Sequence, residues 1–330
     1  MPQTISPGRW RGLKTTSTVY HTFSILAFDQ RDNYRKMLAD PTDFALASQI
    51  KAEVVNILSS HVSAVLLDPI YGLKAALGMA GSSGLLMTLE KTGYSGDSTA
   101  RRVEFIDGWD VAKIKQMGAS AVKILIYYHP DAGDVAEEIE RVIYEVAREA
   151  HQYDLPLFVE PLSYSLDPTI IKDSAAFAEQ RPAIVRETAR RLGTLGGDVL
   201  KLEFPIDVAF DADEIHWQAA CSAISEVSPV PWVLLSGGVN FDTFTRQVEI
   251  ACRSGASGFL GGRAIWKEAV TMNTTDREDF LRHTGINRLV RLMEIVNTHA
   301  RPWTDFYAPI APIEEWFIHY GGVYEPQNDH

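Results

Sequence analysis

The sequence predicts an α/β protein, a single (β/α)8 TIM barrel with an extension at each end. Short apolar runs rich in β-branched residues alternate with segments whose apolar residues recur at three-to-four spacing. This alternation is typical of a parallel sheet built from βα units. The chain has 330 residues, 46% of them hydrophobic, which suits one large domain. A barrel of about 250 residues with extensions accounts for this length.

The expected strands are the apolar runs, and each is followed by polar residues that begin a turn or loop. In chain order they are Ser24–Phe28, Ala64–Leu67, Gly84–Leu89, Ala121–Tyr127, Pro156–Val159, Asp198–Leu202, Trp232–Leu235 and Gly258–Leu260. Eight parallel strands favour closure into a barrel.

The expected helices have the apolar periodicity of amphipathic segments. They are Ala45–Ser59, Val111–Met117, Asp134–His151, Pro182–Leu195, Asp213–Glu226, Phe241–Ser254 and, after the last strand, Arg277–Asn297. The alternative architecture is an open doubly wound sheet, which usually carries a glycine-rich first βα turn. The first turn here reads AFDQRDNYRK and has no glycine, so we favour the barrel.

Three regions follow from this pattern. Residues 1–20 form an N-terminal extension, residues 21–300 the barrel, and residues 301–330 an aromatic, proline-containing tail. We expect the tail, with Trp316, Phe317 and Tyr320, to pack on the barrel or on a partner subunit of a homo-oligomer.

Composition excludes several classes of partner. The net charge is −12 and no basic run occurs, which argues against nucleic acid. No apolar run reaches about 18 residues and the first residues lack the apolar core of a secretion signal, so we expect no membrane partner and a cytoplasmic location. The two cysteines, Cys221 and Cys252, lie in helical segments and are expected to be buried thiols in a reducing compartment.

Polar side chains stand at the C-terminal end of every expected strand, the end at which TIM barrels carry their active sites. They are Asp29, Asp68, Glu90, Lys123, Glu160, Lys201, Ser236 and Arg263. A single charge there is ordinary because strand ends meet water. A complete ring of such groups indicates a functional mouth.

Lys201, in VLKLEFP, is the most informative of these residues. A lysine within a buried strand is either an ion-pair partner, here of Glu160 or Glu203, or a desolvated amine that attacks a carbonyl. Lys123, in VKILIYY, supplies a neighbouring cation that would lower the pKa of Lys201. Glu160, on the strand between them, would move protons. The alternative is a buried salt-bridge network without chemistry.

Two glycine-containing loops predict an anion site after the last two strands, where barrels commonly bind phosphate. Their residues are Ser236, Gly237 and Gly238 in LLSGGVN, and Gly261, Gly262 and Arg263 in FLGGRAIW. Backbone N–H groups would bind the anion and Arg263 would add a charge-assisted contact. Gln30 and Arg31, after Asp29, either meet a second anion or form a solvated pair.

No metal or cofactor is expected. Most of the nine histidines fall on predicted helices, loops or tails, and only His129 lies just beyond a strand. His129 is expected to be a polar loop residue, so the ligand set of a metal-dependent lyase or hydrolase is missing. The GxSxG, Walker and GxGxxG patterns are also absent.

Eight motifs together resemble the class I tagatose-1,6-bisphosphate aldolases and the related sulfofructosephosphate aldolases. They run from about residue 23 to residue 304 and read ILAFDQR, LLMTLEKTGY, GASAVKILIYYHPD, FVEPLSY, DVLKLEFP, WVLLSGGV, ASGFLGGRAIW and ARPWT. The resemblance implies a Schiff-base lysine at Lys201 and a proton-shuttling Glu160. It also implies supporting charges at Asp29, Glu90 and Lys123, with phosphate contacts from the SGG and GGR loops.

The resemblance implies cleavage of tagatose 1,6-bisphosphate to dihydroxyacetone phosphate and glyceraldehyde 3-phosphate. LLMTLEKTGY is closer to the tagatose-bisphosphate branch, and GASGFLGGRAIW at least as close to the sulfosugar branch. The alternative substrate is therefore sulfofructose 1-phosphate, which would give dihydroxyacetone phosphate and sulfolactaldehyde. Two other classes stay open: a non-catalytic barrel that senses a sugar phosphate, and an isomerase or epimerase with Glu160 as base.

Overall fold

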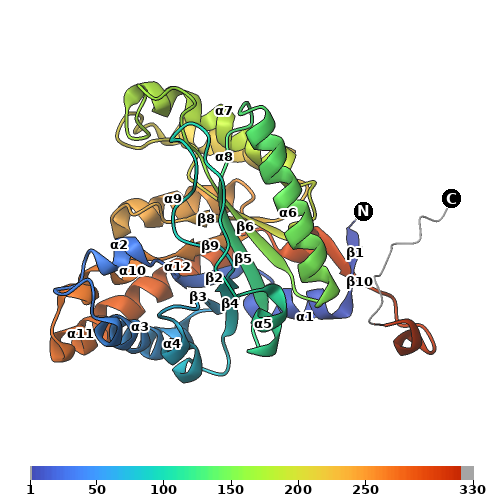
Figure 1. The fold of residues 1–330 in the computed structure, drawn as a ribbon, viewed down its shortest axis with the longest axis horizontal. Coiled ribbons are helices and arrows are strands. Elements are labelled where there is room, and N and C mark those ends of the chain that lie inside the picture. The colour runs from blue at the N-terminus through green and yellow to red at the C-terminus, as the bar shows by residue number, and fades with distance from the viewer. Residues whose placement is uncertain (1, 321–330) are drawn as a thin grey trace.

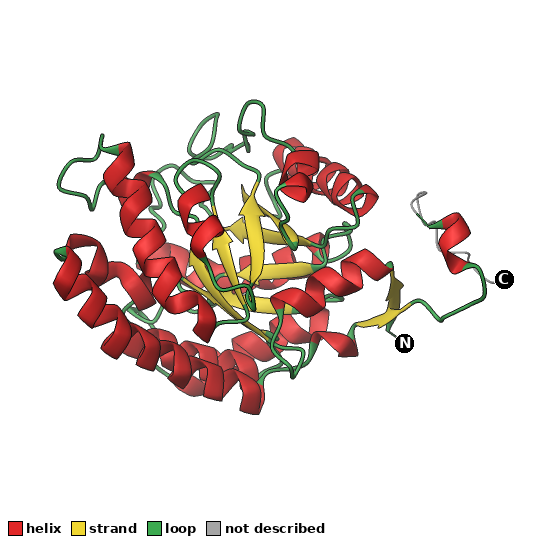
Figure 2. Ribbon diagram, turned by 90° about the horizontal axis from the view of Figure 1, so that it is seen from below, coloured by secondary structure: helices red, strands yellow, loops and turns green. Residues whose placement is uncertain are grey.

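The computed structural model describes residues 2–320 and confirms the (β/α)8 barrel (Figure 1). Eight parallel strands pair in chain order, and the last pairs with the first to close the barrel. They are β2 (Phe23–Phe28), β3 (Ala64–Leu67), β4 (Gly84–Thr88), β5 (Ala121–Tyr127), β6 (Leu157–Leu162), β7 (Val199–Leu202), β8 (Trp232–Leu235) and β9 (Gly258–Gly261). Helices surround this central sheet (Figure 2).

The strands lie where the apolar runs predicted them, with one instructive difference in β6. The expected strand ended at Val159, because a glutamate and a proline follow and both are poor strand formers. In the structure β6 continues to Leu162, which is in register with Tyr127 of β5. Glu160 therefore lies within a strand and is held by the barrel itself.

The outer layer places a helix after each of the first seven barrel strands. These helices are α3 (Phe44–Leu58), α4 (Leu73–Gly78), α5 (Val111–Gln116), α6 (Asp134–Gln152), α7 (Ala175–Leu192), α8 (Glu214–Val227) and α9 (Phe241–Arg253). The expected start of α7, Pro182, is wrong. The helix begins at Ala175, because the Ser174 side chain accepts a hydrogen bond from the N–H of Phe177 and caps it.

The segment after β9 is more divided than the single expected helix. It comprises α10 (Arg263–Trp266), α11 (Thr274–Phe280), a π-helical turn (Leu281–Gly285) and α12 (Ile286–His299). The short α2 (Asp32–Arg35) after β2 was also not expected.

The N-terminal segment and the start of the tail, residues 301–309, lie at the N-terminal end of the barrel. The N-terminal β1 (Gln3–Ile5) pairs in parallel with β10 (Tyr307–Pro309), and α1 (Pro7–Thr16) lies against the starts of β4 and β5 (Figure 1). The buried Trp303 ring meets Trp10 edge-on, with ring centroids 4.6 Å apart. The extensions therefore cover the end of the barrel that is opposite the expected mouth.

The last part of the tail differs in packing. The Trp316 ring meets the rings of Phe317 and Tyr320 edge-on, but the three side chains remain partly exposed, at 41%, 63% and 43%. Residues 321–330, the rest of the predicted tail, lie outside the described residues.

No helix within residues 2–320 is long and apolar enough to cross a membrane. Cys221 and Cys252 are buried free thiols.

Candidate active site

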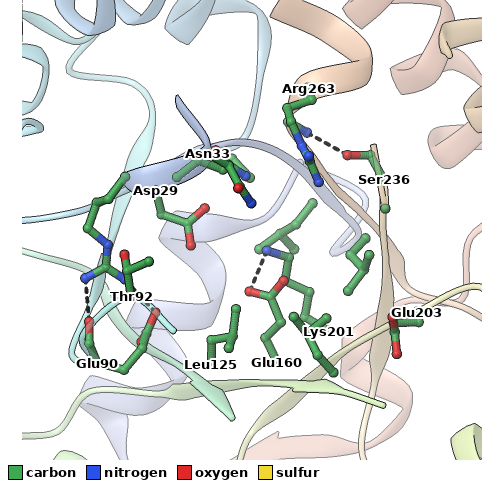
Figure 3. A pocket seen from close by; sticks show the side chains of 18 of the residues that line it. Asp29, Asn33, Glu90, Thr92, Leu125, Glu160, Lys201, Glu203, Ser236 and Arg263 are labelled. Atoms are coloured by element: carbon green, nitrogen blue, oxygen red, sulfur yellow. Dashed lines mark hydrogen bonds and ion pairs between the residues drawn. The ribbon is translucent and has the colours of Figure 1, made fainter. Parts of the chain in front are cut away.

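The C-terminal ends of the strands surround a cavity of about 510 Å³ (Figure 3). Ten of the residues that the sequence predicted for the site line it: Asp29, Gln30, Arg31, Glu90, Glu160, Lys201, Ser236, Gly237, Gly262 and Arg263. The loops after β2, β4, β6, β8 and β9 and the strands β6 and β7 thus converge on one space, as the barrel topology predicts.

Lys123 is the buried centre of the charged cluster. Its ammonium lies 2.9 Å from Asp29 Oδ2, 3.1 Å from Glu90 Oε1 and 2.8 Å from Glu160 Oε2. Burial alone would lower the pKa of Lys123, but the three carboxylates outweigh burial and raise it above its usual value. Lys123 is fully buried, so it is a fixed cation behind the cavity.

Lys201 shares Glu160 with Lys123. The Lys201 ammonium lies 2.8 Å from Glu160 Oε2, the same oxygen that contacts Lys123 (Figure 3). Unlike Lys123, Lys201 lines the cavity, so it is the amine of the pair that a bound molecule can reach.

Glu203, the other partner considered for Lys201, has a different role. Its carboxylate accepts hydrogen bonds from the Ser163 hydroxyl and N–H and lies 2.5 Å from Lys172 Nζ. Burial raises the pKa of Glu203, but Lys172 and Ser163 outweigh it and the pKa is lowered. Lys172 also lines the cavity and was missed, because nothing in its loop sequence marks it as a partner of Glu203.

Asp29 is held as an anion. Burial raises its pKa, but the charges of Lys123, Lys201 and Arg31 outweigh burial and keep the pKa well below the ordinary value. Its Oδ2 binds Lys123, whereas its Oδ1 is buried without a hydrogen-bond partner among residues 2–320. Glu90 Oε2 and Gln30 Oε1 are further buried acceptors without partners in that range.

Arg31 is neither solvated nor free. It is 7% exposed, and its guanidinium donates to the Glu90 backbone oxygen at 2.5 Å and to Glu90 Oε1 at 3.2 Å. The expectation of a solvated pair is therefore wrong, because Arg31 joins the ends of β2 and β4. The side chain of Gln30 approaches the other side of the mouth: a Cβ added at Gly262 would lie 3.2 Å from Gln30 Nε2.

The predicted anion loops meet at one edge of the cavity. The Gly262 N–H donates to Ser236 Oγ at 3.3 Å. Gly237 has a φ of 57°, a left-handed conformation that favours glycine. Within residues 2–320 the Arg263 guanidinium forms no hydrogen bond or ion pair with another side chain or carbonyl, in contrast to Arg31 and Lys172. Arg263 is therefore available to an anion.

Besides Lys123, three predicted positions lie outside the cavity. Gly238 packs beneath the Arg263 guanidinium, since an added Cβ would lie 3.0 Å from its Cζ. Gly261 ends β9 and faces Ile265 and Phe244. Asp68 is fully buried and pairs with a lysine of α3. These residues shape the mouth from behind and do not line it.

The loop between β4 and α5 contains a second arrangement that the sequence did not reveal. The Arg101 guanidinium lies over the rings of Tyr94, Tyr127 and Tyr164, 4.4, 5.0 and 5.1 Å from their centroids. These cation–π contacts fasten the loop to the ends of β5 and β6. Tyr127 also lines the cavity.

No histidine among the described residues, 2–320, lines the cavity. His129 accepts a hydrogen bond from the Asp131 N–H at 3.1 Å, the arrangement of a loop residue. In residues 2–320 no group of three or more His, Cys, Asp or Glu side chains is arranged to hold a metal ion.

Comparison with known proteins identifies the family. The model of the DeoC/LacD family aldolases matches residues 23–268. The chain is 33% identical over 306 residues to the tagatose 1,6-diphosphate aldolase of Lactococcus lactis subsp. lactis, covering 86% of this chain and 93% of that protein. It is 34% identical to tagatose 1,6-diphosphate aldolase 1 of Streptococcus pyogenes serotype M1, with the same coverage.

Solved structures agree on the fold. The fructose-bisphosphate aldolase of Plasmodium falciparum matches with a TM-score of 0.69 at 13% identity, covering 91% of this chain and 98% of that one. An archaeal fructose 1,6-bisphosphate aldolase matches with a TM-score of 0.59 at 20% identity, covering 87% and 98%. The family match over the barrel and the relatives above 30% identity agree, so this chain belongs to the DeoC/LacD family of aldolases and is an aldehyde-lyase.

Proposed function

We propose that this aldolase cleaves a phosphorylated ketohexose through a Schiff base on Lys201, and that tagatose 1,6-bisphosphate is its substrate. The observation that carries the proposal is the position of Lys201, which lines the cavity 2.8 Å from Glu160 while Glu160 also contacts the buried Lys123. An amine beside a carboxylate that can take and return protons is the arrangement that imine chemistry needs.

The reaction begins when Lys201 passes a proton to Glu160 and its neutral amine attacks the C2 ketone. Glu160 returns this proton to the alkoxide of the resulting carbinolamine. It then takes a proton from the carbinolamine nitrogen and gives it to the hydroxyl, which leaves as water, and the nitrogen lone pair forms the iminium. Glu160, in contact with the Lys201 nitrogen, is the group that relays these protons.

Carbon–carbon cleavage follows from the iminium. A base removes the proton of the C4 hydroxyl, the C3–C4 bond breaks, and its electron pair moves into the iminium to form an enamine. Glyceraldehyde 3-phosphate leaves as the aldehyde. Protonation of the enamine at C3 and hydrolysis of the imine then release dihydroxyacetone phosphate and restore Lys201.

The remainder of the cavity suits such a substrate. Arg263, with the Gly237 and Gly262 backbone beside Ser236, would bind the C1 phosphate, since Arg263 has no other partner in residues 2–320. The unpartnered oxygens of Asp29, Glu90 and Gln30 are acceptors, and a ligand rich in hydroxyl donors would satisfy them.

The proposal is tested by assaying tagatose 1,6-bisphosphate, fructose 1,6-bisphosphate and sulfofructose 1-phosphate side by side and comparing kcat/KM. We expect cleavage of tagatose 1,6-bisphosphate to be at least tenfold more efficient than cleavage of either other sugar. A higher kcat/KM for sulfofructose 1-phosphate would assign the enzyme to the sulfosugar substrate instead. Absence of cleavage of all three sugars would refute the proposed function.

A further inference from the structure

The lysine that pairs with Asp68 is Lys51, in the middle of α3 and fully buried. Its ammonium lies 2.5 Å from Asp68 Oδ2 and donates to two backbone oxygens, that of Phe28 at 2.6 Å and that of Gln30 at 3.2 Å. These two carbonyls belong to the residues on either side of Asp29. A single buried cation from outside the barrel therefore contacts the backbone on both sides of an active-site carboxylate.

This ion pair is fully satisfied and enclosed. The other oxygen of Asp68, Oδ1, accepts hydrogen bonds from the N–H groups of Ile70 and Tyr71, both at 2.9 Å. The Lys51 ammonium lies against the Phe28 ring, 4.6 Å from its centroid. A buried ion pair generally contributes no more stability than apolar side chains of the same size. Stability alone therefore does not explain why this buried ion pair is present. Its hydrogen bonds to the backbone on both sides of Asp29 do explain it.

Phe28 is paired with β3, but the two residues after it are not part of the barrel sheet. β2 ends at Phe28, so Asp29 and Gln30 lie beyond the last pairing of the strand with its neighbours. Lys51 holds the carbonyl of the peptide group that precedes Asp29 and the carbonyl of Gln30, one peptide group further on. It thereby restrains the backbone on both sides of Asp29, and this backbone sets the direction of the Asp29 side chain. The same contacts set Gln30, whose side chain approaches Gly262 in the anion loop.

We infer that Lys51, held by Asp68, is a positioning residue for the aldol cleavage: it orients the backbone around Asp29 so that one carboxylate oxygen binds Lys123 and the other faces the substrate. The inference rests on the proposed function. Lys51 does not line the cavity, so its effect on catalysis passes through Asp29.

A double-mutant cycle tests whether Lys51 acts through Asp29. The first change is the paired variant Lys51→Met with Asp68→Asn, which removes both charges together and leaves no unpaired buried ion. Asparagine at position 68 retains an oxygen for the Ile70 and Tyr71 N–H groups. The second change is Asp29→Asn, and the third protein combines all three substitutions. The measured quantities are kcat and KM for tagatose 1,6-bisphosphate, with high enzyme concentration for the slow variants.

We expect the paired variant to lower kcat at least tenfold with KM changed less than threefold. In the Asp29→Asn background we expect the same paired change to lower kcat less than twofold, because the group that Lys51 positions is already altered. An unchanged kcat in the paired variant would overturn the inference. So would an equal fold-loss in both backgrounds, which would indicate a general structural effect.

The matched control uses a second ion pair of the same helix, in which the arginine is buried and the glutamate is partly exposed. Arg277 of α11 pairs with Glu53 of α3 and donates to the backbone oxygens of Ala269 and Met272 at 2.9 and 2.6 Å, away from the cavity. The variant Arg277→Met with Glu53→Gln removes the same kind of buried contact from α3. We expect it to lower the thermal midpoint while kcat stays within twofold of wild type. A tenfold loss of kcat in this control would show that loosening α3 suffices, and would overturn the role of Lys51.

The wild-type assay distinguishes a failure of the proposed aldolase function from a failure of the positioning role of Lys51. A wild-type enzyme that cleaves none of the three sugars refutes the proposed function, and the positioning role falls with it. A wild-type enzyme that cleaves sugar but gives an additive cycle refutes only the positioning role.

Discussion

At the scale of single residues, the geometry around Glu160 separates two lysines that look alike in the sequence. Both Lys123 and Lys201 contact Glu160 Oε2 at 2.8 Å, but Lys123 also meets Asp29 and Glu90 and is closed off from the cavity. The pKa of Lys123 is raised by these carboxylates, which outweigh its burial, so it keeps its proton. Lys201 is the lysine that a ketone can approach.

Arg263 provides a prediction about binding alone. We expect Arg263→Ala to raise KM for tagatose 1,6-bisphosphate about tenfold or more, because a charge-assisted hydrogen bond of about 1.5–3 kcal/mol is lost, with a smaller change in kcat. Steady-state kinetics measure both constants. Lys267→Ala, which alters a neighbouring cation outside the cavity lining, is the control. An unchanged KM in Arg263→Ala would contradict the assigned phosphate contact.

At the scale of elements, the extensions are joined to the strand that carries Lys201 through Asp198. Arg9 of α1 contacts Asp198 Oδ1 at 2.6 Å, and His151 of α6 lies 3.1 Å from Oδ2. Tyr307 of β10 donates to the Asp198 backbone oxygen at 2.8 Å. Asp198 precedes β7 and is fully buried. Its carboxylate holds the N-terminal helix and its backbone oxygen holds the start of the tail, so both extensions are attached at this one residue.

We therefore predict that Asp198→Asn destabilises the fold by roughly 3–5 kcal/mol at pH 7, the usual effect of breaking a buried ion pair. Burial raises the pKa of Asp198, but Arg9, His151 and the Leu157 N–H outweigh it and lower the pKa to about 2. A lowered pKa contributes stability above the ordinary value of 3.8 that is lost as the pH falls towards about 2. The difference between wild type and variant should shrink across that window.

Urea denaturation at pH 7 and at steps below pH 4 measures this difference. The exposed pair of Arg190 and Glu187 on α7 supplies the control: Glu187→Gln should change the unfolding free energy little. Equal stability of wild type and Asp198→Asn at pH 7 would refute the role assigned to the carboxylate.

The elements also show what a sequence can and cannot predict. The strands were predictable because a strand buried on both faces is a continuous apolar run, and the barrel rule then placed their polar ends in one mouth. Ion pairs between a strand end and the helical layer were not predictable. Lys51 lies within an ordinary helical pattern, and only the fold brings it beneath the backbone around Asp29. The sequence therefore placed Asp68 among the polar residues of the mouth, whereas in the structure it pairs with Lys51.

In the molecule as a whole, the residues that stabilise the fold and the residues of the candidate site lie at opposite ends of the barrel. The N-terminal end is covered by α1 and the pair of β1 and β10 (Figure 1), whereas the C-terminal end holds the cavity with its charged groups (Figure 3). Such a division is typical of TIM-barrel enzymes, in which loop ends carry the reactive groups and the opposite face supports the fold. This arrangement supports the covalent role proposed for Lys201.

Borohydride trapping is the most direct test of a Schiff base on Lys201. The enzyme is incubated with dihydroxyacetone phosphate at a concentration at which calorimetry shows binding, sodium borohydride is added, and the labelled peptide is identified by mass spectrometry. We predict one reduced adduct per chain, on Lys201, and no adduct in Lys201→Ala. A bound ligand that leaves Lys201 unlabelled, or an adduct on Lys123 instead, would contradict the assignment of Lys201 as the Schiff-base lysine.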